Sequence, residues 1–329
     1  MRAAITATGH HVPADVYPNE YFTHRLDTTD EWIRSRTGIV ERRFARDGGT
    51  SDLAVAAARR CLEARGIAPA AVDGIVVATM TPDRPLPSTA AIVQRKLGAA
   101  NAWGFDVAAA CSGFIYALIT AAKLVEAGAL RCALVCGAER MSTVIDPLDR
   151  ATSVLFGDGA GAVLVEPIAD DSVGILDHVC AMDGGGEHAL YIPSGGSVQP
   201  PSVESVAARE HFVVQDGPAV FRAAVTGMAE ITEALLKRTR LASAEIDWLV
   251  PHQANRRIIE AVAKRIGFDL ARVVINLDRF GNTVAATIPL GLSELNEQKR
   301  LAYGDRVVLT AFGAGYTSGA IYLRWAIRA

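Results

Sequence analysis

The order of apolar and polar segments repeats once along the chain, with a period of about 170 residues. After Val173, VGILDHVCAMDG follows the pattern of the N-terminal segment, and AEIDWLVPHQ follows that of AAVDGIVVAT. The later segments RVVINLDRFGNTVAATIPLGL, DRVVLTAFGAG and SGAIYLRWA correspond to WGFDVAAACSGFIYALITAA, RCALVCGAE and GAGAVLVEP. Each half alternates strand-like and helix-like segments. The repeat therefore predicts two α/β units related by pseudo-twofold symmetry, with their loops facing a shared cleft.

The size and composition of the chain agree with two such units. With 329 residues, we expect one half at 1–170 and the other at 171–329. Half of the residues are apolar, the net charge is −3, and no apolar run approaches the roughly 20 residues that span a bilayer. These values predict a soluble protein without a membrane or nucleic-acid partner. The N-terminus lacks the features of a secretory signal, and the five cysteines form no CxxC pair, so we expect reduced thiols and a cytoplasmic location.

Local signals place several elements along the chain. Thr28 or Thr29 is expected to cap a short helix over residues 30–35. Residues 184–217 are rich in glycine, serine and proline and have no counterpart in the first half, which indicates a surface excursion over the cleft. Apolar patterns predict further helices at 51–64, 88–97 and 113–127 and strands at 74–78 and 132–136, with another strand ending near 167.

A single cysteine follows the apolar segment GFDVAAA and precedes a helix-like segment. Cys111 is therefore expected at a strand-to-helix turn, where unpaired N–H groups and the helix dipole favour thiolate over thiol. Small residues at positions 108–113 leave room for a substrate carbonyl beside the sulfur. This is the geometry that acyl transfer requires, although a lone cysteine more often fills a core.

Two further polar side chains are predicted at strand ends of the second half. Of the seven histidines, His252 is the one that follows an apolar strand and precedes a polar turn. Asn282, in FGNT, falls close to the place that Cys111 takes in its own half. Taken singly, His252 fits a structural histidine and Asn282 an ordinary turn residue. Together, a thiol, an imidazole and an amide at corresponding strand ends indicate a site that handles thioesters.

Seven motifs along the chain resemble the β-ketoacyl-acyl-carrier-protein synthase III family: DTTDEWIRSRTGI, AAACSGF, DPLDRAT, FGDGAGA, WLVPHQANRRI, GNTVAATIP and AFGAGYTSG. They occur in the family's order over nearly the whole chain. The resemblance implies the thiolase-like fold, an α/β fold with two pseudo-symmetric βαβαβ halves in five layers, and a homodimer. It also implies an acyltransferase that condenses an acyl-CoA primer with malonyl-acyl-carrier protein, with loss of CO2, to initiate fatty-acid synthesis. The acyl-CoA is a substrate, and neither a cofactor nor a metal is implied.

The resemblance also implies roles for the catalytic residues. Cys111 would accept the acyl group as a thioester. His252, as a neutral donor, and Asn282 would hydrogen-bond the malonyl thioester carbonyl and favour the enolate formed when CO2 leaves. The N–H groups of Cys111 and Ala314 would hold the developing oxyanion; the family often has glycine at position 314.

Substrate contacts are implied in the same way. Trp32 would stack on the adenine of CoA, Arg150 would flank its other face, Arg36 would meet phosphate and Asn255 would contact the pantetheine end. Basic residues on two helical segments are candidates for docking an acidic carrier protein, and an ordinary solvated face is the alternative for them: Arg222, Arg257, Lys264 and Arg265.

One departure from the family concerns the acyl pocket. Many members have phenylalanine at the position of Leu86, and it reaches across the dimer to close the pocket end. The smaller leucine predicts room for a branched or longer primer, unless neighbouring side chains fill the space.

Two other functions remain open. A synthase III homologue of secondary metabolism, of the polyketide or quinolone type, would use another acceptor with the same residues. A non-catalytic partner subunit would have lost the nucleophile, and the presence of Cys111, His252 and Asn282 argues against it.

Overall fold

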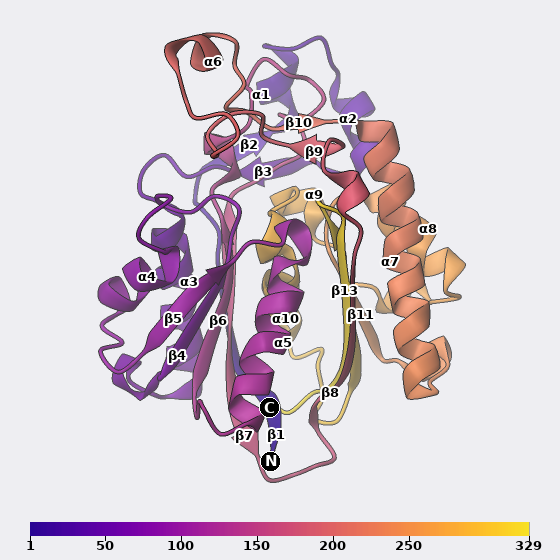
Figure 1. The fold of residues 1–329 in the computed structure, drawn as a ribbon. Helices are drawn as coiled ribbons and strands as arrows, with labels where there is room; N and C mark the ends of the chain where they lie inside the picture. The colour runs from indigo at the N-terminus through magenta and orange to yellow at the C-terminus, as the bar shows by residue number, and fades with distance from the viewer. Residues whose placement is uncertain (329) are drawn as a thin grey trace.

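Two β-sheets lie side by side with helices between them (Figure 1). The computed structural model describes residues 1–328. The larger sheet has five strands in the order β1-β7-β6-β4-β5. Its strands, in that order, are β1 (Arg2–His11), β7 (Gly159–Ile168), β6 (Ala133–Glu139), β4 (Gly74–Ala78) and β5 (Trp103–Val107).

The second sheet follows the same plan with four strands in the order β11-β12-β13-β8. The parallel pair β11–β12 corresponds to β4–β6, and the antiparallel pairs β12–β13 and β13–β8 correspond to β6–β7 and β7–β1. The segment that corresponds to β5 forms only an isolated bridge between Leu249 and Val273. The strands are β11 (Trp248–Pro251), β12 (Arg306–Gly313), β13 (Thr317–Arg324) and β8 (Gly174–Met182).

This repetition is the one that the sequence predicts, and the order of layers is that of the predicted thiolase-like fold. The expected boundary at residue 170 falls in the connection from β7 to β8, between the two sheets. The division into two domains stays a prediction.

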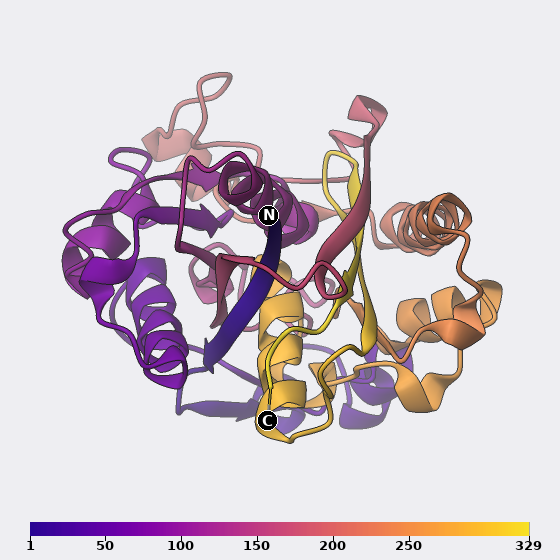
Figure 2. The ribbon, with the colours of Figure 1, turned by 90° about the horizontal axis from the view of Figure 1, so that it is seen from below.

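Helices form three of the five layers, as Figures 1 and 2 show. The middle layer, α5 and α10, packs against both sheets, so α5 carries apolar residues on nearly every side. The outer layers cover the far face of each sheet. The middle helices are α5 (Gly113–Glu126) and α10 (Thr287–Glu297), and the outer ones are α3 (Thr50–Arg65), α4 (Thr89–Leu97), α7 (Gly217–Thr239) and α8 (Arg256–Arg265).

The predicted elements agree with these bounds to within a few residues, because their end signals are local. Ser88 caps α4 by accepting from the N–H of Ala91, and the strand predicted at 74–78 is β4. The predicted strand at 132–136 begins one residue later and runs to Glu139 as β6. Within residues 1–328, none of the helices combines the length and the apolar character that crossing a bilayer requires.

Short elements gather at one end of the sheets, at the top of Figure 1. They include the excursion predicted over residues 184–217, which forms a two-stranded sheet and one short helix. The elements are β2 (Val16–Pro18), α1 (Asn19–Thr23), α2 (Asp30–Thr37), β3 (Glu41–Arg43), β9 (Leu190–Tyr191), α6 (Val203–Ala207), β10 (Val214–Gln215) and α9 (Leu277–Phe280).

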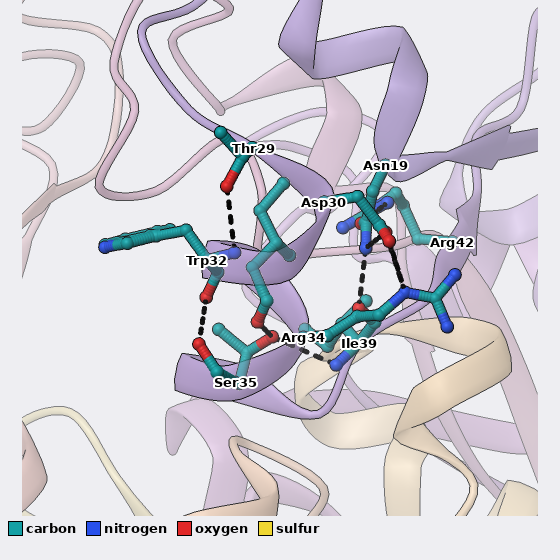
Figure 3. Close-up of polar contacts among 10 residues, drawn as sticks. Asn19, Thr29, Asp30, Trp32, Arg34, Ser35, Ile39 and Arg42 are labelled. Carbon is teal, nitrogen blue, oxygen red and sulfur yellow. Dashed lines mark hydrogen bonds and ion pairs between the residues drawn. The ribbon is translucent and has the colours of Figure 1, made fainter.

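Helix α2 is fastened to this end by a buried polar network (Figure 3). The Thr29 hydroxyl accepts from the N–H of Trp32 and begins the helix, as expected. Asn19 donates to Asp30 and accepts from the fully buried guanidinium of Arg42, which also donates to the Val154 carbonyl. Burial of a guanidinium is costly unless its N–H groups find acceptors. Here both terminal nitrogens of Arg42 find them, while its Nε has none within residues 1–328, and these bonds hold the start of α2 in a defined position.

Candidate active site

Cys111 lies at a strand-to-helix turn, as predicted. Strand β5 ends at Val107, a short 3-10 turn covers Ala110–Ser112, and α5 begins at Gly113. Ala110 adopts φ 46°, in the left-handed region that L side chains rarely occupy. The side chain of Cys111 is 7% exposed and lines two cavities. The turn therefore presents the sulfur to a cleft while the flanking backbone stays packed.

The second half contains the same turn. A 3-10 turn over Val284–Ala286 leads into α10, and Val284 adopts φ 51°. Such a conformation is costly for a β-branched residue and persists only where surrounding contacts over-determine it. Here the N–H of Val284 donates to Asn282 Oδ1 over 2.9 Å.

A cavity of about 460 Å³ brings the three predicted side chains together, since Cys111, His252 and Asn282 all line it. They are supplied by the 3-10 turn before α5, the position after the end of β11 and the loop after α9. The carboxyl ends of strands from both halves thus meet at one cleft, as the repeat predicts.

His252 follows β11 and is 2% exposed. The backbone N–H of His252 donates to the Thr310 carbonyl over 2.8 Å. The ring Nδ1 lies 2.8 Å from Oγ1 of Thr287. Burial lowers the pKa of His252 to about 3, because imidazolium loses its hydration in the cavity wall. The ring is therefore neutral at physiological pH.

Asn282 is oriented by its own loop. The backbone N–H of Asn282 donates to the Leu155 carbonyl over 2.9 Å, and the side-chain Oδ1 accepts from the backbone N–H of Val284. Since a backbone N–H must face the oxygen of the amide, the Nδ2 group is left as a donor for the cavity that Asn282 lines.

The expected preference of Cys111 for thiolate is wrong for this structure. Burial raises the pKa of Cys111 to about 12, and the negative charge of Glu139 adds to the rise. The free energy lost when the thiolate is removed from water is larger here than the stabilisation that one helix N-terminus provides. The thiol is protonated at neutral pH, so a reaction at the sulfur would require the loss of this proton.

Glu139 was not anticipated from the sequence. This last residue of β6 is fully buried, and its carboxylate accepts hydrogen bonds from Thr79, Met80 and Thr81. Burial raises its pKa to about 7 despite these donors. A single charge in the apolar segment ALVCGAE was the signal that could have identified it.

Strand β12 brings Ala314 beside Cys111. A Cβ at Gly313 would lie 2.7 Å from the backbone nitrogen of Cys111, so the close approach depends on glycine. The Thr317 hydroxyl donates to the Ala109 carbonyl, and the Ser112 hydroxyl donates to the Thr317 carbonyl, each over 3.0 Å. Ala314 and Cys111 consequently line the same two cavities.

The residues assigned to CoA lie along the wall of the larger cavity, except Arg150. Trp32, Arg36 and Asn255 line it, and the guanidinium carbon of Arg150 lies 5.3 Å from the centre of the Trp32 ring. Asn255 is already engaged: its Nδ2 donates to the Arg36 carbonyl and its Oδ1 caps α8 by accepting from the N–H of Arg257. A pantetheine contact through Asn255 stays a prediction.

The four residues assigned to carrier docking are exposed on α7 and α8. Arg257 also lines the larger cavity. The guanidinium of Arg265 lies 3.2 Å from Oε1 of Glu233 and 3.3 Å from Oε1 of Glu230, and these carboxylates compensate its charge. Arg222 and Lys264, in contrast, belong to none of the ion pairs found within residues 1–328. Docking by these residues stays a prediction.

A smaller, apolar cavity of about 100 Å³ adjoins Cys111. Met141, Val144, Phe156 and Val213 lie in its wall. Leu86 lines neither cavity of its own chain and is 83% exposed in the connection from β4 to α4. Its predicted role therefore depends on a second subunit.

Comparison with known proteins identifies the family. A family model described as 3-oxoacyl-[acyl-carrier-protein (ACP)] synthase III matches residues 105–184, and a model of the C-terminal part of that family matches residues 236–325. The β-ketoacyl-[acyl-carrier-protein] synthase III of Chlorobium chlorochromatii is 52% identical over 99% of this chain and 100% of the relative's length. The corresponding protein of Koribacter versatilis is 50% identical over 99% and 98%.

Solved structures give the same result. The 3-oxoacyl-(acyl carrier protein) synthase III of Pseudomonas aeruginosa has a TM-score of 0.92 and 38% identity, with both chains covered completely. The priming β-ketosynthase of the R1128 polyketide pathway also has a TM-score of 0.92, with 36% identity over 99% of this chain and 96% of the other. The chain belongs to the β-ketoacyl-[acyl-carrier-protein] synthase III family.

Proposed function

We propose that this protein catalyses the decarboxylative Claisen condensation of an acyl-CoA primer with malonyl-acyl-carrier protein, the step that initiates fatty-acid synthesis. The observation that carries the proposal is the cavity shared by Cys111, His252 and Asn282, with the backbone of Ala314 at the sulfur. A thiol, two neutral donors and a backbone donor are the groups that thioester chemistry uses.

In the first half-reaction, the sulfur of Cys111 attacks the acyl-CoA carbonyl. The N–H groups of Cys111 and Ala314 stabilise the oxyanion, and the tetrahedral intermediate collapses to an acyl-cysteine thioester. The thiol proton leaves Cys111 and the departing CoA thiolate gains one, so no net proton is released. CoA enters along the wall that contains Trp32 and Arg36.

In the second half-reaction, His252 and Asn282 donate hydrogen bonds to the malonyl thioester carbonyl. Breaking the bond to the carboxylate releases CO2 and leaves an enolate on that carbonyl. The carbanion attacks the acyl-Cys111 carbonyl, and the thiolate that leaves takes up one proton. Loss of CO2 supplies the carbanion, so the proposal includes no metal and no resident cofactor.

The test separates Cys111 from another cysteine of the chain. Intact mass after incubation with acetyl-CoA should rise by one acetyl group in the wild type and in Cys180→Ser, because Cys180 is an exposed cysteine outside both cavities. It should not rise in Cys111→Ser. Malonyl-acyl-carrier protein should then release CO2 and be converted into acetoacetyl-acyl-carrier protein. Acylation that persists in Cys111→Ser would refute the assignment.

A second candidate function is priming with another acceptor, favoured by the likeness to the R1128 priming β-ketosynthase. The residues and the first half-reaction would be unchanged. Offering the acylated protein malonyl groups on carrier proteins of fatty-acid and of polyketide type separates the two functions by which carrier receives the β-ketoacyl group.

We also propose a homodimer and a cytoplasmic location. Strand β5 is an edge strand whose Trp103 is exposed and stacks on Phe105, and an uncovered apolar edge favours pairing with a second chain. Five unpaired cysteines agree with a reducing compartment. Light scattering should give the mass of a dimer, and Trp103→Lys should shift it toward a monomer.

In that dimer, Leu86 of one subunit would close the acyl cavity of the other. Its exposure leaves it available for such a contact. A leucine in place of phenylalanine would lengthen the cavity. Each further methylene of the primer that the cavity accommodates can contribute about 0.8 kcal/mol of binding free energy. Leu86→Phe should therefore reduce kcat/KM for isobutyryl- and octanoyl-CoA while acetyl-CoA is retained. An unchanged ranking of primers would exclude Leu86 from the cavity end.

A further inference from the structure

Thr287, the first residue of α10, lies between His252 and the backbone of the strained turn. Its Oγ1 is 2.8 Å from Nδ1 of His252 and 3.0 Å from the Val284 carbonyl oxygen. All three residues are at most 4% exposed. We propose that Thr287 is a positioning residue that donates its hydroxyl proton to Nδ1 of His252 and thereby keeps the ring proton on Nε2.

The hydroxyl has a single proton, and its direction determines the tautomer of the ring. If the hydroxyl donates to Nδ1, this nitrogen is bare, and a neutral ring carries its proton on Nε2. If the hydroxyl donates to the Val284 carbonyl, it accepts from Nδ1, and Nε2 is bare. The two arrangements contain the same atoms, but Nε2 is a hydrogen-bond donor in the first and an acceptor in the second.

Two acceptors lie within reach of the hydroxyl proton, Nδ1 of His252 at 2.8 Å and the Val284 carbonyl at 3.0 Å. The Val284 carbonyl already accepts the N–H of Thr287 in the 3-10 turn. A hydrogen bond with the Val284 backbone raises the pKa of His252, so without the hydroxyl this carbonyl is the remaining acceptor in the turn for a ring proton. The Val284 N–H is occupied by Asn282 and cannot donate to the ring. Thr287 is therefore the group in this turn that can favour the Nε2–H form.

The inference rests on the proposed function at one point, the malonyl half-reaction. Burial keeps the ring neutral at physiological pH, so His252 cannot donate from both nitrogens at once. It can hydrogen-bond the malonyl carbonyl only when Nε2 carries the proton. Acylation of Cys111 does not require this donor, since the N–H groups of Cys111 and Ala314 hold its oxyanion.

The corresponding position of the first half supports a specific role. The turn over Ala110–Ser112 leads into α5 at Gly113, as the turn over Val284–Ala286 leads into α10 at Thr287. The backbone plan is the same in both halves, with a left-handed residue opening each turn. The hydroxyl is thus not needed to build the turn, and it occurs in the half that supplies the histidine.

The test compares Thr287→Val with Thr287→Ser in the full-length protein. Valine keeps the shape and removes the hydroxyl, so the Val284 carbonyl becomes the partner of Nδ1 and Nε2 loses its proton. Decarboxylation should fall about 10²-fold, the loss typical of one oxyanion-type donor, while acylation by acetyl-CoA stays within about threefold of the wild type. Thr287→Ser should restore decarboxylation. Thr239→Val is the matched control, because it removes a partly buried hydroxyl at the far end of α7, where Thr239 donates to the Leu235 carbonyl.

A readout that does not depend on activity is the ¹⁵N spectrum of histidine-labelled protein, in which protonated and bare ring nitrogens have separate shifts. The signals of His252 are assigned by their loss in His252→Gln. The wild type and Thr287→Ser should show the proton on Nε2, and Thr287→Val should show it on Nδ1. A proton on Nδ1 in the wild type, or equal losses in both half-reactions of Thr287→Val, would overturn the inference. If the wild type performs neither half-reaction, the proposed function fails, and the spectrum still decides for or against Thr287.

Discussion

Gly313 offers a direct test of the backbone that surrounds Cys111, the proposed nucleophile. An alanine Cβ there would meet the nitrogens of Cys111 at 2.7 Å and Ser112 at 3.0 Å. Ordinary contacts begin near 3.4 Å, so the end of β12 and the turn of Cys111 must separate by about 0.7 Å (3.4 − 2.7). Both neighbours are backbone atoms and cannot swing aside as a side chain would.

This separation should affect catalysis more than folding. The two proposed oxyanion donors, the N–H groups of Cys111 and Ala314, lie on opposite sides of the contact. Misplacement by a large part of 1 Å, or the loss of one such donor, typically costs about 10²-fold in rate. The overpacking itself should cost about 1–3 kcal/mol of unfolding free energy. We expect Gly313→Ala to fold and to have kcat reduced about 10²-fold.

The assay is steady-state condensation of acetyl-CoA with malonyl-acyl-carrier protein, combined with thermal unfolding and alkylation of Cys111 by iodoacetamide. Gly196→Ala is the matched control, because a Cβ at Gly196 meets no atom within 4 Å. Gly313→Ala should still be alkylated at Cys111. A folded Gly313→Ala variant with kcat within about threefold of the wild type would refute the reasoning.

Three further predictions follow from the charges and the aromatic wall of the site. Glu139→Gln removes the negative charge that adds to the raised pKa of Cys111, so alkylation of Cys111 by iodoacetamide at pH 8 should be faster than in the wild type; an equal or slower rate would contradict this. The pKa of His252 is lowered in the folded protein from 6.5 to about 3, so its contribution to stability is present above pH 6.5 and is lost as the pH falls toward 3. In urea titrations, the free energy of unfolding of the wild type should decrease more steeply between pH 6.5 and 4 than that of His252→Gln, and parallel curves would argue against a buried neutral ring. Trp32→Ala should raise KM for acetyl-CoA about tenfold through loss of stacking and leave the decarboxylation rate of pre-acylated enzyme unchanged, whereas Trp32→Phe should recover most of the affinity.

Much of the fold could be predicted because its signals are local and occur twice. Cap residues such as Thr29 and Ser88 determine where α2 and α4 begin, and the repeated order of segments predicts equivalent strand pairing in both sheets. The segment equivalent to β5 is the exception. It pairs through a single bridge at Val273, because hydrogen bonding across a sheet edge depends on neighbours distant in sequence.

The candidate site residues could be named from the sequence, but their chemical states could not. Strand-end positions and motifs identified Cys111, His252 and Asn282, and the structure places all three at one cavity. The ionisation of Cys111 depends on burial and on Glu139, which lies on another strand. The engagement of Asn255 with the Arg36 carbonyl likewise requires α2 and α8 to be neighbours.

The amino-acid sequence alone determined the two-part α/β plan, the ends of many helices and the residue types that thioester chemistry needs, since these depend on periodicity, capping and side-chain identity. The tertiary structure decided the protonation of the thiol, the availability of each donor and the contact of Thr287 with His252. Desolvation and hydrogen-bond direction are properties of a packed environment assembled from segments far apart in the chain, and no local pattern of residues encodes them.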